Sequence, residues 1–281
     1  MDAQISKAWK TAAYIVCALV MLLLPLSPAR GDALSDWSAI AARMVSSSGQ
    51  SRAAQELAVV YAAMFEAMNF VEGKYVPRFL VKQPAPLGGS GEAEAIGAAH
   101  HVLAQLYPGQ KPHLDAALER SLAAFSDWDA AYRACIWGRH LGGNVYASAL
   151  STPERASNRV ESGTSGETWS SIAARSIEGR ALQPIERARI YALVSLAAST
   201  VYSAADDAKA SYGSPIACVS CAVGAAIRVI LESESGSRSE PGKAYLIPVR
   251  NEGDESRSTK AGEELGTQIG LQALTYYRRI Q

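Results

Sequence analysis

Apolar residues recur along the chain with the period of an α-helix. In segment 52–71 they appear at steps of three and four, which places them on one helix face. These residues are Leu57, Val60, Tyr61, Met64, Met68 and Val71. Segments 92–106, 112–125 and 127–150 repeat the pattern, with Pro- or Gly-containing turns between them. The sequence therefore predicts an all-α fold with little strand.

Three other stretches depart from helical periodicity. Segment 245–249 alone has the alternation of an extended strand. Segments 151–168 and 232–258 are rich in Ser, Gly and charged residues, and the second also contains two prolines. We expect both to be loops.

The second half of the chain repeats features of the first. Trp-Ser-Ala-Ile-Ala-Ala-Arg begins at Trp37, and Trp-Ser-Ser-Ile-Ala-Ala-Arg begins at Trp169. A Gln follows each Trp after 13 or 14 residues, and an Ala-rich helix follows each Gln. Both halves end in the pattern Gly-x-x-Leu-Gly, starting at Gly138 and at Gly262. Glycines four residues apart share one helix face, where two backbones can approach closely.

This repeat predicts two related helical bundles packed together. We place the N-terminal bundle at residues 34–150 and the C-terminal bundle at 169–281, joined by a linker at 151–168. Similarity by chance among Ala-rich helices is the simpler explanation. The matching order of the starts and ends argues against it.

Residues 1–31 have the composition of a signal peptide. Lys7 and Lys10 precede an apolar run at 11–26, and small residues follow it. The run is short for a membrane span, which needs about 20 residues. We expect bacterial export to the periplasm or outside the cell. If the segment is not cleaved, it is the only expected membrane contact.

Composition excludes one class of partner and limits the cysteine chemistry. Lys+Arg and Asp+Glu both number 27, so the chain has no excess positive charge that would favour binding to nucleic acid.

Removal of the signal segment leaves Cys135, Cys218 and Cys221. Three cysteines cannot all pair with one another, so in an oxidising compartment one thiol stays outside any disulfide within the chain. A local disulfide between Cys218 and Cys221, or two buried thiols, is expected over catalysis, because the fold around a thioredoxin pair is absent.

The second half carries chemistry-bearing residues in three ordered segments. Lys209 precedes Ser214-Pro215, Ser220 precedes a helix rich in small residues, and Arg257 precedes Gly262. With the helical pattern of both halves, this order resembles the vanadium-dependent haloperoxidases and the type 2 phosphatidic acid phosphatase superfamily. The resemblance covers roughly residues 36–279.

The resemblance implies an oxyanion site whose catalytic groups are gone. In that family a Lys, two Arg, a Ser and a helix N-terminus hold vanadate or phosphate, and two His carry the chemistry. Here Ser214 and Ala222 occupy an Arg and a His position, and no histidine follows His140. Lys209, Ser220 and Arg257 would then form a relic anion site without catalytic residues. Vanadate or phosphate is its candidate ligand, and no resident cofactor is expected.

The histidines suggest no metal site. All four lie in the first half, and no carboxylate or cysteine completes a recognisable ligand set with them. They are His100, His101, His113 and His140.

Three functional hypotheses follow. The first is an exported protein of the haloperoxidase and phosphatase fold that has lost catalysis and acts as a binding or accessory protein. The second is a divergent phosphatase or vanadate-dependent peroxidase with a rebuilt site that includes Cys221. The third is an unrelated exported helical interaction protein. A protein partner or a second copy of the chain is expected, because the short second bundle would leave an apolar face exposed.

Overall fold

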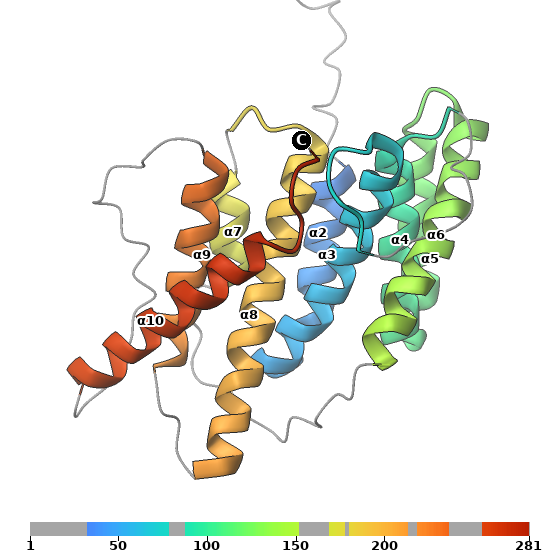
Figure 1. The fold of residues 1–281 in the computed structure, drawn as a ribbon. Helices are drawn as coiled ribbons and strands as arrows, with labels where there is room; N and C mark the ends of the chain where they lie inside the picture. The colour runs from blue at the N-terminus through green and yellow to red at the C-terminus, as the bar shows by residue number, and fades with distance from the viewer. Residues whose placement is uncertain are drawn as a thin grey trace, which may run out of the picture. The chain divides into compact units, whose positions relative to one another are not determined.

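The computed structural model describes residues 33–78, 88–151, 169–177, 180–212, 218–235 and 255–280. The predicted signal peptide at 1–31, the strand at 245–249 and nearly all of the linker lie outside these residues. The described residues form nine α-helices and one short 3₁₀ helix (Figure 1). In chain order they are α2 (Ala33–Val45), α3 (Gln50–Glu72), α4 (Gly91–Leu106), η1 (Pro108–Gln110), α5 (Lys111–Ala123), α6 (Trp128–Ser151), α7 (Trp169–Ile177), α8 (Pro184–Tyr212), α9 (Val219–Ser235) and α10 (Glu255–Leu274). The all-α prediction is confirmed.

Local sequence explains where several helices begin and end. The Ser90 hydroxyl accepts a hydrogen bond from the Ala93 amide and caps α4. Gly73 ends α3 with φ of 63°, a left-handed conformation that glycine adopts at low cost. One prediction was wrong at its edges, because helix occupies both ends of the expected loop at 232–258. Glu234 pairs with Arg189 of α8, which holds the last turn of α9 in helical form.

α3 lies at the centre of the packing and is buried on more than the single predicted stripe. It packs against α2, α4, α6 and α8. Four neighbours leave few exposed positions, so alanines between the predicted apolar residues are buried as well. The predicted stripe is buried except for its last member, Val71, which is 37% exposed.

Glycine contacts join helix pairs in both halves. A Cβ on Gly138 of α6 would lie 1.9 Å from the Glu94 carbonyl oxygen of α4. A Cβ on Gly266 of α10 would lie 2.0 Å from the Ala222 carbonyl oxygen of α9. Real Cβ atoms essentially never come this close to another heavy atom. The predicted role of these glycines in close helix contact is confirmed.

One hydrophobic core spans both halves. Its largest cluster includes buried residues from α2, α3 and α4 together with others from α7, α8 and α9. Residues 33–281 form one compact unit. Since the core is shared, the division into two bundles stays a prediction.

The C-terminal segment packs back onto the first half. Tyr75 and Arg279 form an isolated antiparallel bridge. Tyr277 packs against Phe65 with ring centroids 4.4 Å apart, and its carbonyl accepts a hydrogen bond of 2.8 Å from Arg189. These contacts tie the end of the chain to α3 and α8.

No helix among the described ranges combines the length and apolar character that a membrane span requires.

Candidate functional site

The predicted anion site lies at the ends of three helices. Lys209 is near the end of α8, Ser220 is in the first turn of α9, and Arg257 is in the first turn of α10. The amide of Cys218 donates a 3.1 Å hydrogen bond to the Ser258 carbonyl, so the starts of α9 and α10 adjoin. The side chains of Lys209 and Arg257 are outside the described residues. Whether the three groups meet therefore stays a prediction.

A disulfide joins Cys218 and Cys221 at the start of α9. The Cys221 amide donates to the Cys218 sulfur over 3.3 Å, and the Ser220 hydroxyl lies 3.4 Å from that sulfur. Cys135 is a free, buried thiol on α6. Burial raises its pKa to about 11, so it carries little thiolate at neutral pH. Neither Cys221 nor Cys135 is therefore poised as a nucleophile.

The histidines are spread over the first half of the fold. His100 of α4 is buried, and its Nε2 lies 2.8 Å from an Asp115 carboxylate oxygen of α5. Burial lowers the pKa of both His100 and His101. His113 lies on α5 and His140 on α6, both exposed. Within the described ranges, no cluster of His, Cys, Asp and Glu could hold a metal ion.

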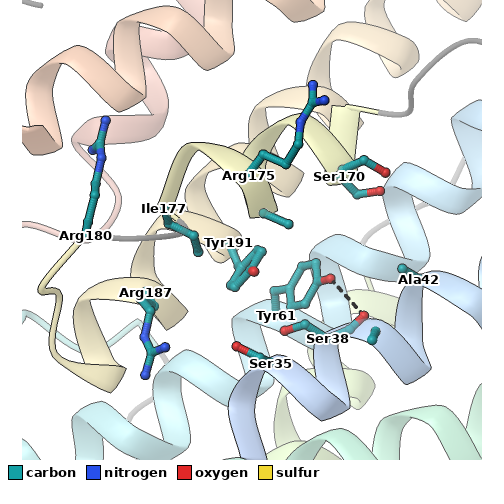
Figure 2. Close-up of a pocket in the computed structure, with 13 residues that line it drawn as sticks. Ser35, Ser38, Ala42, Tyr61, Ser170, Arg175, Ile177, Arg180, Arg187 and Tyr191 are labelled. Carbon is teal, nitrogen blue, oxygen red and sulfur yellow. Dashed lines mark hydrogen bonds between the residues drawn. The ribbon is translucent and has the colours of Figure 1, made fainter. Parts of the chain in front are cut away.

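A pocket of about 580 Å³ lies between α2 and α7, with residues of α3 and α8 among its walls (Figure 2). Its size is typical of sites for small molecules. It is lined by Ser35, Ser38, Ala39, Ala42, Tyr61, Ser170, Ser171, Ala174, Arg175, Ile177, Arg180, Arg187 and Tyr191.

The internal repeat forms two walls of this pocket. Ser38 and Ser170 each follow the repeated Trp directly, and both line the pocket. Ala42 and Ala174 also occupy matching positions in the repeat, and both line it. Sequence reasoning missed the pocket. The repeated Trp-Ser segment is the signal that could have pointed to it, since residues of both copies line one cavity.

Two buried tyrosines form the apolar interior of the pocket. The rings of Tyr61 and Tyr191 stack with centroids 5.0 Å apart and planes inclined by 22°. Burial, reinforced by the neighbouring Tyr191, raises the pKa of Tyr61 far above its ordinary value. Its neutral hydroxyl donates to the Ser38 carbonyl over 3.4 Å. The Ser38 side chain is 6% exposed, and its hydroxyl has no hydrogen-bond partner among the described residues.

Arginines surround the pocket. Arg175 and Arg180 are exposed and Arg187 is half-buried. The described residues that line the pocket include no Asp, Glu, His or Cys. In Figure 2 the side chains of Arg175 and Arg180 extend toward the top of the view and that of Arg187 toward the bottom. The described lining therefore carries arginines and no acidic side chain, but the arginines do not converge on one small anion.

A buried carboxyl lies in a different part of the fold. Glu94 of α4 is 0% exposed, and neither of its carboxyl oxygens has a hydrogen-bond partner in the described structure. Burial raises its pKa to about 8, so the group is largely protonated at neutral pH. Sequence reasoning placed Glu94 in a helix but gave no reason to expect a buried carboxyl.

No protein-family model, no curated protein and no solved structure matches this chain.

Proposed function

We propose that this chain is a binding protein with a haloperoxidase- and phosphatase-like helical body that has lost catalysis. Its ligand site is the pocket between α2 and α7. The observation that carries the proposal is the lining of this pocket, which combines arginines, hydroxyl groups and a stacked tyrosine pair. Export to the periplasm or outside the cell is part of the same proposal.

The placement of the histidines supports loss of the family's chemistry. Phosphoryl transfer and halide oxidation in that family need imidazole groups at the oxyanion site. Ala222 occupies one of these positions on α9. The four histidines lie on α4, α5 and α6 instead, while α9 packs on α7, α8 and α10.

The pocket lining supports binding over bond-making. A serine becomes a strong nucleophile when a general base accepts its proton. The described lining residues offer four serines but no imidazole or carboxylate to act as that base. Arginine and serine can instead donate hydrogen bonds to oxygen atoms of a ligand.

Activity assays on the purified protein test the loss of catalysis. Hydrolysis of p-nitrophenyl phosphate, and bromide oxidation with vanadate and hydrogen peroxide, should not exceed the rates in buffer. Lys209→Ala and Arg257→Ala should behave like the parent chain in both assays. Turnover that either substitution abolishes would show that the predicted oxyanion site is active, and would contradict the proposal.

The rival proposal is an enzyme with a site rebuilt from Lys209, Ser220 and Arg257, to which Cys221 could add a thiol. The disulfide with Cys218 argues against it, since a disulfide-bonded sulfur is not a free thiolate nucleophile. A Cys221→Ser variant that keeps ligand binding and changes only stability agrees with a binding protein. Loss of a measurable turnover in that variant would favour the rival.

A further inference from the structure

We infer that the ligand of the α2–α7 pocket is a small aromatic carboxylate that carries a hydrogen-bonding group on its ring. This inference rests on the proposed function and adds the chemical class of the ligand. It is drawn from the interior of the pocket, the buried Ser38 hydroxyl and the arginines in its lining.

The interior fits a flat ring. Tyr61 and Tyr191 stack on each other and line the pocket, where they are 3% and 6% exposed. The helices on either side contribute small side chains, Ala42 from α2 and Ala174 from α7. Aromatic rings favour offset-stacked and edge-to-face contacts with other rings. An aromatic ligand therefore gains more from this interior than an inorganic anion does.

Ser38 supplies a specific polar contact. Its side chain is 6% exposed and lines the pocket, and its hydroxyl has no hydrogen-bond partner among the described residues (Figure 2). A buried polar group without a partner is unfavourable, and a ligand that bonds to it removes that penalty. A hydroxyl on the ligand ring can both donate to Ser38 and accept from it.

The arginines explain why the ligand carries one negative charge rather than being a bare oxyanion. Arg175, Arg180 and Arg187 all line the pocket, so an anionic group is attracted there. Arg175 and Arg180 extend toward the top of the view in Figure 2 and Arg187 toward the bottom, so they do not enclose one phosphate or vanadate ion. A carboxylate on an aromatic ring can contact one arginine while the ring itself contacts the tyrosines.

Calorimetric titration of the purified protein tests this class with four probes: 4-hydroxybenzoate, benzoate, acetate and inorganic phosphate. We expect 4-hydroxybenzoate to bind most tightly and benzoate next. Acetate and phosphate should bind at least about tenfold more weakly than benzoate. Ser38→Ala should weaken 4-hydroxybenzoate by about threefold to tenfold, the effect of one hydrogen bond, and leave benzoate nearly unchanged.

Arg175→Gln has a matched control in the same chain. Arg43 occupies the equivalent position in the repeat, is exposed, and does not line the pocket. Arg175→Gln should weaken both aromatic acids by at least about threefold, and Arg43→Gln should leave them within about twofold of the parent. Equal effects of the two substitutions would overturn the placement of the ligand.

The remaining outcomes separate the two proposals. Tight binding of phosphate with no binding of the aromatic acids would overturn the ligand class and leave a binding protein. No heat with any of the four probes would overturn both the class and the pocket as the ligand site. A thermal unfolding scan of each variant checks that a lost signal is not a lost fold.

Discussion

The two halves of this chain share a backbone contact but differ in the chemistry placed beside it. In the first half the Gly138 backbone of α6 packs against Glu94 of α4, and in the second Gly262 of α10 packs against Cys218, the residue before α9. The residue and its glycine partner are 44 positions apart in both pairs. Glycine fixes how closely the helices approach, whereas the side chain at the partner position has diverged.

The difference changes what each half can respond to. The first half buries a carboxyl group whose pKa is raised to about 8 by burial. The second half has a disulfide at the matching place. The first contact is therefore sensitive to pH and the second to reducing agents.

The largest effect is expected from adding a methyl group at the glycine contacts. Gly138→Ala and Gly262→Ala, at matching positions of the repeat, would place a Cβ 1.9 Å and 2.5 Å from a backbone oxygen, and the backbone cannot move as a side chain does. Each should lower the free energy of unfolding by at least about 3 kcal/mol, the upper end of overpacking effects. Urea unfolding measures it. Gly109→Ala is the control, because a Cβ at that position would have nothing within 4 Å.

The comparison requires that both substitutions lower the free energy of unfolding. If Gly262→Ala destabilises the protein and Gly138→Ala does not, the two contacts are unequal and the comparison between halves fails.

The buried carboxyl should give a pH dependence that belongs to the first half. Burial raises the pKa of Glu94 from 4.5 to about 8. Between these two pH values the folded state therefore holds a proton on Glu94 that the unfolded state has released. Stability contributed by this proton is present below pH 4.5 and is lost as pH rises toward 8. Between about pH 5 and 9 the loss should be roughly 3 kcal/mol, and Glu94→Gln should remove most of it.

Urea unfolding across this pH range, with Glu119→Gln as an exposed control on α5, measures the effect. A Glu94→Gln profile parallel to the parent profile would mean that this carboxyl ionises as freely as an exposed one.

The disulfide should give a smaller effect in the second half. Cys218 and Cys221 are three positions apart, so the closed loop is short. The entropy model then gives about 2 kcal/mol for the double substitution to serine. Chemical reduction of the parent protein should give a similar loss in urea unfolding, whereas the double variant should show none on reduction. Sensitivity of the variant to reductant would place the redox-sensitive group elsewhere.

The smallest effect compares the two repeated serines in the pocket. Ser38→Ala removes a buried hydroxyl without a partner among the described residues and should raise the free energy of unfolding by roughly 0.5–1 kcal/mol. Ser170 is only half-buried, so Ser170→Ala should leave stability unchanged or slightly lower. Differential scanning calorimetry resolves the sign. Equal changes in the free energy of unfolding of both variants would mean that the Ser38 hydroxyl has a hydrogen-bond partner in solution.

Sequence patterns predicted the helices well, because apolar periodicity reports directly on burial. Segment 52–71 became α3 with its ends displaced by one or two residues. The loop expected at 232–258 was wrong at both ends. At its start, Glu234 pairs with Arg189, which is far away in sequence. Composition alone cannot show such a partner.

The candidate site was harder to predict than the fold. The motifs drew attention to Lys209, Ser220 and Arg257, whereas the pocket lies between two segments that the repeat made conspicuous for another reason. Ser38 and Ser170 are ordinary residues in the sequence. Their place in the lining of one cavity depends on α2 packing on α3 and α7 packing on α8, the two helices that carry the stacked tyrosines.

The most direct test of the account is to map the bound ligand by NMR. A titration of isotope-labelled protein with 4-hydroxybenzoate should shift backbone amides of α2 and α7, including Ser38 and Ser170, in a saturable manner. Amides around the predicted oxyanion site, such as Ser220, should stay unchanged. Saturable shifts confined to the start of α9 would contradict the account, because they would place binding at the predicted oxyanion site instead of the pocket.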